Sequence, residues 1–266
     1  MTSLSIPDSN ETMLLRELNH RINDEFSSSI STLSTAAVRA DNPEVKLALS
    51  NVVDMLQEHA NLNRILAVPD GDELVDAAEY IRKLGLAVSR CALEPIGIRL
   101  SLVADTLPLE AKRCWRLALA VHELVRNAAR HACFDGRDGA IKIKLSLIDT
   151  VVNCIVADNG SISARLKPGR GLQIVGDLAK SLGGRLQYGF GEQFSSFLLV
   201  FPVTEGELRA NRAVALRRSR GARHRKVAPR TRSQTARQPL EAFLGAAVDR
   251  EPTKVATHSH DAVDLS

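Results

Sequence analysis

The chain has 266 residues, of which 44% are hydrophobic, and a formal net charge of +4, which is ordinary for a globular protein of one or two domains. No apolar run approaches the length of a membrane span, and the polar start MTSLS lacks the basic region and apolar core of an export signal. The composition therefore disfavours membrane-spanning and exported proteins, and we expect a cytoplasmic one.

Residues 9–68 predict two long helices. Apolar residues recur every three or four positions in the first, at Leu15, Leu18, Ile22, Phe26, Ile30, Leu33 and Ala37. The sequence Asp41-Asn42-Pro43 then breaks the pattern, and Pro43 suits the first position of a second helix. That helix carries Val45, Leu49, Val52 and Leu56 at the same period. A hairpin buries two such faces poorly alone, so a four-helix bundle made by two copies is predicted.

Residues 122–132, HELVRNAARHA, predict a helix with a chemically unusual side. At 100° per residue one stripe carries Glu123, Asn127, Arg130 and His131. The neighbouring stripe carries Leu117, Val121, Leu124 and Ala128, which would face a core. The stripe of polar side chains is either an ordinary solvated face or a binding surface, and this segment alone leaves both open.

Two glycine-bearing segments follow. Residues 152–160, VNCIVADNG, predict a strand that ends at a turn presenting Asp158. Gly169 and Gly171 open a helical pattern that runs to Leu182 and stops at two glycines. Glycines before a helix allow close approach, and the free N–H groups of its first turn favour anions. A Rossmann site is disfavoured, because no strand of a tight βαβ unit precedes Gly169.

In this order the three segments resemble the ATP-binding domain of the GHKL group, and within it the sensor histidine kinases. Residues 122–132 resemble the N box, residues 158–160 the first glycine box and residues 169–175 the second. The resemblance extends through residues 178–186 to a closing strand at 195–202. It implies an α+β chain whose residues 72–203 form a Bergerat-type α/β sandwich, with helices on one face of a mixed sheet.

The resemblance also implies roles for individual residues, with ATP and Mg²⁺ as cofactors. Asn127 would be the Mg²⁺ ligand and Glu123 the catalytic acid of the N box, acting as a base or organising water. Asp158 would bind the adenine amino group, with Gly160 allowing the ring to approach. The other nucleotide-binding positions would be Arg130, His131, Gly169, Gly171, Leu172 and Ser195.

Residues 17–22, ELNHRI, resemble the phosphoacceptor box in which the reactive histidine precedes an arginine. His20 lies two residues from both Leu18 and Ile22, which directs it away from the apolar face. A solvated surface histidine is the alternative. A neutral imidazole nitrogen is a competent nucleophile near neutral pH, and Arg21 could orient the incoming phosphate.

These features together predict a homodimeric histidine kinase that phosphorylates His20 from ATP and passes the phosphoryl group to a response-regulator receiver domain. A separate upstream sensor protein is a further candidate partner. The chain departs from the family pattern at residues 23–26 (NDEF), at Ile162 and Phe194 where glycines are usual, and in a short 161–168 lid. Two alternatives therefore stay open: a degenerate phosphotransfer or scaffold dimer, and a GHKL regulatory module of the anti-sigma type. The paired N-terminal helices argue against the second.

Residues 204–266 form a basic tail. They contain 13 of the 35 Lys and Arg residues but only 7 of the 31 Asp and Glu residues, with few large apolar groups. Such a composition predicts a disordered, solvated segment. Contact of the tail with nucleic acid or an anionic membrane is the less favoured interpretation.

Overall fold

The computed structural model describes residues 9–132, 134, 136, 138–161, 170–191 and 194–224. Contacts divide the chain into two units, Met1–Leu216 and Arg217–Ser266. Of the predicted features, Gly169, Ile162 and the rest of the lid to residue 168 lie outside the described residues, as does the tail beyond residue 224.

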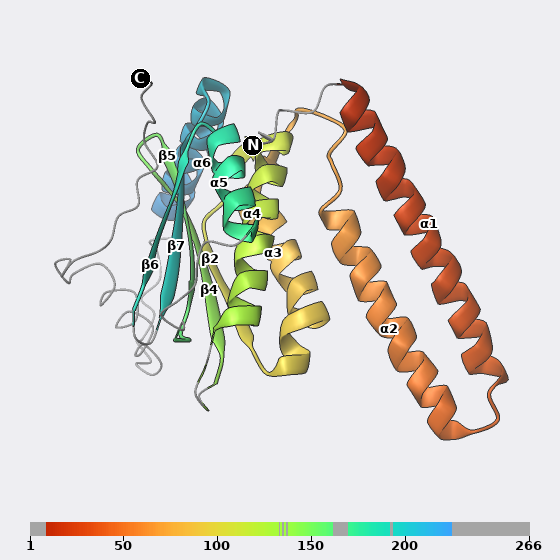
Figure 1. Ribbon diagram of the computed structural model, residues 1–266. Coiled ribbons are helices and arrows are strands. Elements are labelled where there is room, and N and C mark those ends of the chain that lie inside the picture. Colours follow the sequence, from red (N-terminus) through yellow and green to blue (C-terminus); the bar gives the residue numbers. More distant parts are fainter. Residues whose placement is uncertain are drawn as a thin grey trace, which may run out of the picture. The chain divides into compact units, whose positions relative to one another are not determined.

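The two N-terminal helices form where the sequence predicts them, as α1 (Ser9–Arg39) and α2 (Pro43–Ile65) (Figure 1). Pro43 begins α2, and the side chain of Asn42 accepts a hydrogen bond from the Glu44 N–H at 2.8 Å. A cap of this kind satisfies one of the free N–H groups at a helix start and typically stabilises it by about 1 kcal/mol.

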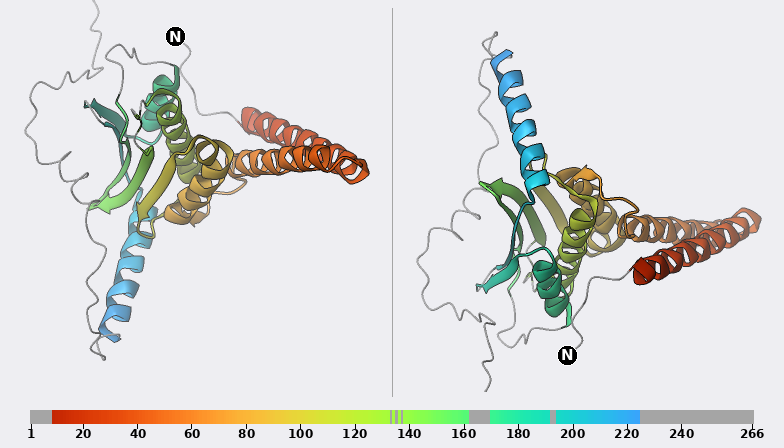
Figure 2. Two further views of the ribbon diagram at one scale, coloured as in Figure 1. Left: turned by 90° about the horizontal axis from the view of Figure 1, so that it is seen from below. Right: turned by 90° about the horizontal axis from the view of Figure 1, so that it is seen from above.

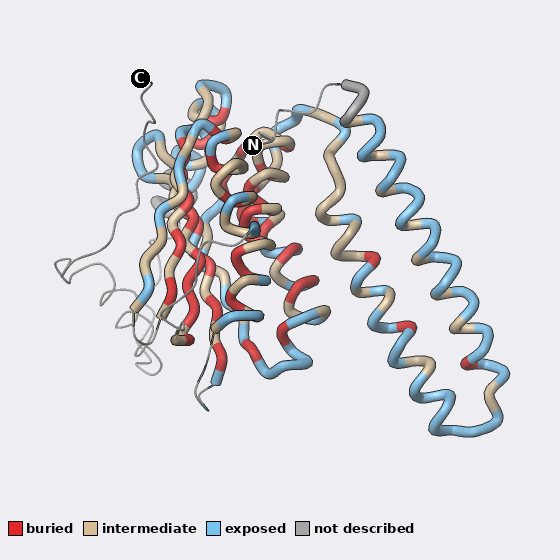
Figure 3. Tube along the Cα trace, in the orientation of Figure 1, coloured by how far each residue is buried: buried red, intermediate tan, exposed pale blue. Residues whose placement is uncertain are grey.

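The contact between α1 and α2 uses only part of the predicted apolar face. Ala37 is buried and Phe26 and Ile30 are partly buried, but nearer the N-terminus Asn23 faces α2 and bonds to Asn63 at 3.2 Å. Leu18 and Ile22 stay 55% and 36% exposed, and most of the hairpin is solvent-accessible in this chain (Figure 3). The apolar stripe of α1 thus remains available for a further partner.

The rest of the first unit is built on a five-stranded mixed sheet. Its spatial order is β2 (Arg99–Ala104), β4 (Ala140–Ile148), β5 (Val151–Asp158), β7 (Ser195–Pro202) and β6 (Arg185–Phe190). The β2–β4 pair is parallel and the other pairs are antiparallel. Two short strands, β1 (Leu74–Asp76) and β3 (Pro108–Glu110), pair separately.

Three helices lie on one face of this sheet, as the views in Figure 2 show. They are α3 (Ala77–Val88), α4 (Ala111–His131) and α5 (Arg170–Ser181). A π-helical turn (Ser89–Leu93) and a 3-10 turn (Glu94–Ile96) connect α3 to β2. The predicted combination of helices with a mixed sheet is confirmed.

The core lies between the sheet and these helices. Alternate residues of β5, namely Val152, Cys154 and Val156, are at most 1% exposed, which is the period-two pattern of a strand with one packed face. From α4, Leu117 and Leu124 meet them with exposures of 0% and 1%. Full burial of each large aliphatic side chain stabilises the fold by about 1.5–3 kcal/mol.

The prediction of a disordered tail from residue 204 is wrong for its first part, because residues 205–224 form helix α6 (Glu205–His224). Thr204 and Glu207 make a reciprocal cap: the Glu207 N–H donates to Thr204 Oγ1 at 3.2 Å, and the Thr204 N–H donates to Glu207 Oε2 at 2.8 Å. This capping box is readable in the sequence as T-x-x-E, but overall composition obscured it. Glu207 is also fully buried, which composition argues against.

Within the described residues, no helix is long and apolar enough to cross a membrane. The cytoplasmic location stays a prediction.

Candidate functional site

The end of β5 carries a buried carboxylate. Asp158 is 2% exposed and pairs in register with Ser195 of β7. Its Oδ1 atom accepts hydrogen bonds from the Gly160 N–H at 2.9 Å and from the Ser195 hydroxyl at 3.4 Å. Two residues that lie 37 positions apart in the sequence are thereby joined.

Burial raises the pKa of Asp158 from 3.8 to about 6, and the hydrogen bonds from Gly160 and Ser195 oppose that rise. Removal from water disfavours the charged form of a carboxyl group, whereas donors that face the carboxylate favour it. Above pH 6 the site therefore holds a buried, ionised acceptor, which is suited to a ligand that donates a hydrogen bond.

Asn159 and Gly160 fasten the end of β5 to its neighbours. The Asn159 side chain accepts from the Ala140 N–H at 2.8 Å and donates to the Asp138 carbonyl at 3.0 Å, which closes the start of β4. A Cβ atom on Gly160 would lie only 2.5 Å from that of Ala132, just after α4. Glycine is thus required here by close packing against α4.

The polar stripe of α4 meets the first turn of α5. A Cβ atom on Gly171 would lie 2.5 Å from Glu123 Oε1 and 3.2 Å from Asn127 Oδ1. The Glu123 side chain is 14% exposed and pairs with Arg126 at 3.3 Å. The backbone of Gly171 therefore rests directly on the acid and the carboxamide that the sequence pattern singled out.

These contacts form two clusters, one around Asp158 and one around Gly171, Glu123 and Asn127. The remaining predicted site residues belong to the same helices as the second cluster or to the segment before α5. Arg130 and His131 are exposed in the last turn of α4, and Leu172 is partly buried against the core. Gly169 lies outside the described residues. The site residues that sequence reasoning did not single out are Asn159 and Ala132, although both lie within the quoted motifs.

His20 belongs to a different part of the chain. It is exposed on α1, where its neighbour Arg21 pairs with Glu17 at 2.9 Å. Within the described part of the chain, no hydrogen bond or ion pair joins His20 to the clusters around Asp158 and Asn127. The structure thus brings together residues from three segments, 122–132, 158–160 and the described part of 169–175. It does not place His20 beside them.

The two clusters offer complementary chemistry. Asp158 offers a buried acceptor, while the first turn of α5 carries N–H groups and a dipole that favour an anion. Asn127 and Glu123 supply the hard oxygen donors that Mg²⁺ prefers. Such a donor set fits Mg²⁺ shared with phosphate groups and water, which is how proteins usually hold this ion.

Replacing Asp158 with asparagine should stabilise the ligand-free protein at neutral pH. Because the pKa of Asp158 is raised in the folded state, its contribution to stability is greatest below about pH 4 and is lost as the pH rises through about 6. The gain from the substitution should be about 1–2 kcal/mol larger at pH 8 than at pH 5. Urea unfolding at both pH values measures it.

The matched control is Asp138→Asn, which alters a carboxylate that is 84% exposed near the start of β4. The gain of Asp158→Asn between pH 5 and pH 8 is compared with that of this control, so that the difference reports the burial of Asp158. A gain for Asp158→Asn that did not grow between pH 5 and pH 8 would contradict the raised pKa.

The comparisons with known proteins point to one family. Residues 92–188 match the family model of the histidine kinase-like ATPase domain. The sensor histidine kinase PdtaS of Mycobacterium tuberculosis (strain CDC 1551 / Oshkosh) is 28% identical over 174 residues, which cover 63% of this chain and 34% of that protein. PdtaS of Mycolicibacterium smegmatis is 28% identical over 169 residues, 63% of this chain and 32% of that protein. The chain thus spans about a third of the length of these curated relatives.

Among solved structures, the histidine kinase domain of the Erythrobacter litoralis EL346 blue-light activated histidine kinase aligns with a TM-score of 0.49 and 20% identity. The alignment covers 66% of this chain and 96% of that one.

Proposed function

We propose that the chain phosphorylates His20 from ATP and transfers the phosphoryl group to a response-regulator aspartate. The match of residues 92–188 to the family model of the histidine kinase-like ATPase domain and the similarity to sensor histidine kinases support this proposal. The observation that carries the proposal is the meeting of Gly171 with Glu123 and Asn127, close to the end of α4 that packs on Gly160. An anion-binding helix start, oxygen donors and a buried carboxylate acceptor are the parts that phosphoryl transfer from a nucleotide needs.

The buried end of the site would recognise the base. Asp158 would accept a hydrogen bond from the adenine amino group, and the missing side chain at Gly160 would leave room for the ring. Ser195 supports this role because its hydroxyl holds Asp158 in place. Guanine carries a carbonyl oxygen where adenine carries this amino group, so Asp158 would favour adenine.

The open end would hold the phosphates. The first turn of α5 offers N–H groups, while Arg130 and His131 would offset phosphate charge at the exposed end of α4. Asn127 would ligate Mg²⁺, which neutralises charge on the transferring phosphoryl group when it is bound.

In the reaction, a ring nitrogen of His20 attacks the γ-phosphorus while the bond to the oxygen shared with the β-phosphate breaks, and ADP leaves. The proton on the other ring nitrogen is then lost to a base, a role that we assign to Glu123. In the second step, a carboxylate oxygen of a receiver aspartate would attack the phosphorus of the phosphohistidine, and the imidazole would leave. The exposure of His20 supports both steps, since both need an accessible ring.

We assign phosphoacceptor and dimerisation functions to residues 9–68, and nucleotide binding to residues 72–203 extended by α6. The exposed apolar residues of the hairpin support a dimer. They are Leu14, Leu15, Leu18 and Ile22 on α1 and Val45, Val52 and Met55 on α2. A monomer gains nothing from an apolar stripe in water, whereas a second copy would bury it in a four-helix bundle.

Ile22→Asp should therefore dissociate the dimer and leave each subunit folded. Ile22 is 36% exposed, so the charge is tolerated in a single chain but is costly once a second copy buries it. Multi-angle light scattering should give the mass of one chain for this variant and of two chains for the wild type. Circular dichroism should be unchanged.

Val38→Asp is the matched control. Val38 is 78% exposed on α1 but lies 16 residues from Ile22, which places it about 160° round the helix. This variant should remain dimeric. Dimers of equal stability in both variants would show that the association surface lies elsewhere.

The kinase proposal is tested by incubating the full chain with γ-labelled ATP and Mg²⁺. Incorporation of label that is stable to base and labile to acid is expected, because phosphohistidine has this behaviour and phosphoserine does not. A chain that binds a non-hydrolysable ATP analogue but incorporates no label would instead be the degenerate phosphotransfer or scaffold dimer. A chain that neither binds the analogue at millimolar concentration nor incorporates label would contradict the kinase proposal and leave a phosphotransfer or scaffold dimer in its place.

A further inference from the structure

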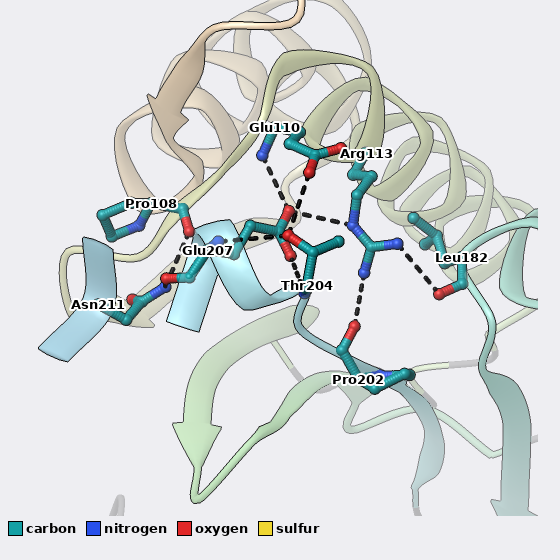
Figure 4. Close-up of polar contacts among 8 residues, drawn as sticks. All are labelled: Pro108, Glu110, Arg113, Leu182, Pro202, Thr204, Glu207 and Asn211. Atoms are coloured by element: carbon teal, nitrogen blue, oxygen red, sulfur yellow. Dashed lines mark hydrogen bonds and ion pairs between the residues drawn. The ribbon is translucent and has the colours of Figure 1, made fainter. Parts of the chain in front are cut away.

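A buried polar cluster anchors α6 to the domain (Figure 4). Glu207 is fully buried, and its Oε1 atom accepts hydrogen bonds from the Glu110 N–H at 2.9 Å and from Arg113 Nε at 3.0 Å. Its Oε2 atom accepts from the Thr204 N–H at 2.8 Å. The carboxylate therefore joins the first turns of α4 and α6.

Arg113 extends the cluster to two further elements. Its Nη1 atom donates to the carbonyl of Leu182, just past α5, at 3.3 Å, and Nη2 donates to the carbonyl of Pro202 at the end of β7. The guanidinium also lies 5.4 Å from the ring centre of Phe201. With its side chain only 13% exposed, Arg113 depends on Glu207 to balance its charge.

The proposed nucleotide site lies at the other end of the pair of helices formed by α4 and α5. Arg113 near the start of α4 holds the end of α5, whereas Glu123, later in α4, touches Gly171 at the start of α5. The two helices therefore run antiparallel. Ten residues of α4 span about 15 Å and eleven residues between Gly171 and Leu182 span about 17 Å, so the two contacts bracket one helix pair.

We infer that Glu207 is a positioning residue of the nucleotide site, acting through Arg113 on the register of α5 against α4. Gly171 has no room to shift toward Glu123 and Asn127, since a single added carbon would already lie 2.5 Å from the carboxylate. A slide or tilt of α5 at its Leu182 end would thus change the position of Gly171 against Glu123 and Asn127. The inference rests on the proposed nucleotide function. It assigns to α6 a role in positioning the proposed ATP site.

The test compares two variants of the cluster with one control in the full chain. Glu207→Gln removes the charge that balances Arg113, and Arg113→Lys replaces a fork that reaches three elements with a single amino group. Asn211→Ala is the control, because Asn211 also fastens α6 but donates to two backbone carbonyls, of Pro108 at 2.9 Å and of Glu207 at 2.8 Å, and not to the Glu207 carboxylate. Thr204→Ala gives a milder perturbation if Glu207→Gln does not fold. It removes the methyl group and the hydroxyl, which caps α6 and donates to Glu110 Oε1 at 3.1 Å, but it keeps the pair of Glu207 with Arg113.

Two measurements separate positioning from general stability. The first is hydrogen exchange of the amides of residues 171–176 without nucleotide, and the second is the affinity for a non-hydrolysable ATP analogue with Mg²⁺. We expect Glu207→Gln and Arg113→Lys to speed exchange and to weaken binding by about fivefold or more. Asn211→Ala should leave both unchanged at a comparable fall in melting temperature.

Equal effects of Asn211→Ala and Glu207→Gln at equal loss of melting temperature would overturn the inference, because stability alone would then explain them. So would unchanged exchange and binding in both cluster variants. A wild-type chain that bound no nucleotide, but whose α5 exchange still depended on Glu207, would contradict the proposed function and leave the coupling between the two ends of α5 in place.

Discussion

Replacing His20 with alanine is expected to abolish autophosphorylation while leaving nucleotide binding and dimerisation intact. The imidazole is the proposed acceptor, and His20 is the single histidine of α1. His20 is exposed, and it lies opposite the apolar stripe of α1, so its loss removes neither core packing nor the predicted subunit contact. The measurement is label from γ-labelled ATP, followed by acid and base treatment.

The control is His59→Ala, because His59 is a second exposed histidine on the hairpin, in α2. That variant should incorporate label as the wild type does. Undiminished label in His20→Ala would remove His20 from the reaction, and loss of label in both variants would point to damage of the hairpin.

Replacing Asn127 with alanine should have the second largest effect, a loss of at least about a hundredfold in phosphorylation rate. The carboxamide is the proposed protein ligand of Mg²⁺. Removing one preorganised group that stabilises charge in a transition state, such as an oxyanion-hole donor, costs about 10²–10³ in rate, and we expect a loss of this order here. Single-turnover labelling over a range of Mg²⁺ concentrations measures the rate. Calorimetry with the ATP analogue reports the loss in binding.

Asn153→Ala serves as the matched control. Asn153 is a partly buried asparagine of β5 whose side chain bonds locally, to the Val151 carbonyl at 3.2 Å. It should leave the rate and its Mg²⁺ dependence unchanged. If Asn127→Ala behaved in the same way, the metal would have to be held by other groups.

The segments with strong local chemistry could be predicted from the sequence. The 3.6-residue period placed Glu123 and Asn127 on one side of α4, and Asn42 and Pro43 marked the start of α2 through capping that involves only adjacent residues. The apolar run before Asp158 indicated β5 and its turn. In each case the decisive interaction lies within a few residues, so the helix or strand can be predicted without knowing the fold.

Contacts between distant segments needed the tertiary structure. That Gly171 rests on Glu123, or that Ser195 bonds to Asp158 across 37 positions, follows from strand register and helix packing. The resemblance to a family implied that these residues share a site, but not that Gly160 packs against Ala132 or that Asn159 closes β4. Side-chain packing between elements decides such contacts, and no local pattern encodes it.

The helix α6 shows most clearly which contacts are local in the sequence and which need the tertiary structure. By itself the sequence determined a capping box at Thr204 and Glu207, because that exchange of hydrogen bonds spans only three residues. Only the tertiary structure decided that the helix docks, since a buried glutamate is unfavourable unless a cation reaches it, and Arg113 lies 94 positions away. A charge count treats Glu207 as a surface residue, whereas the fold adds to the local Thr204 N–H a guanidinium and the Glu110 N–H, which make its burial stable.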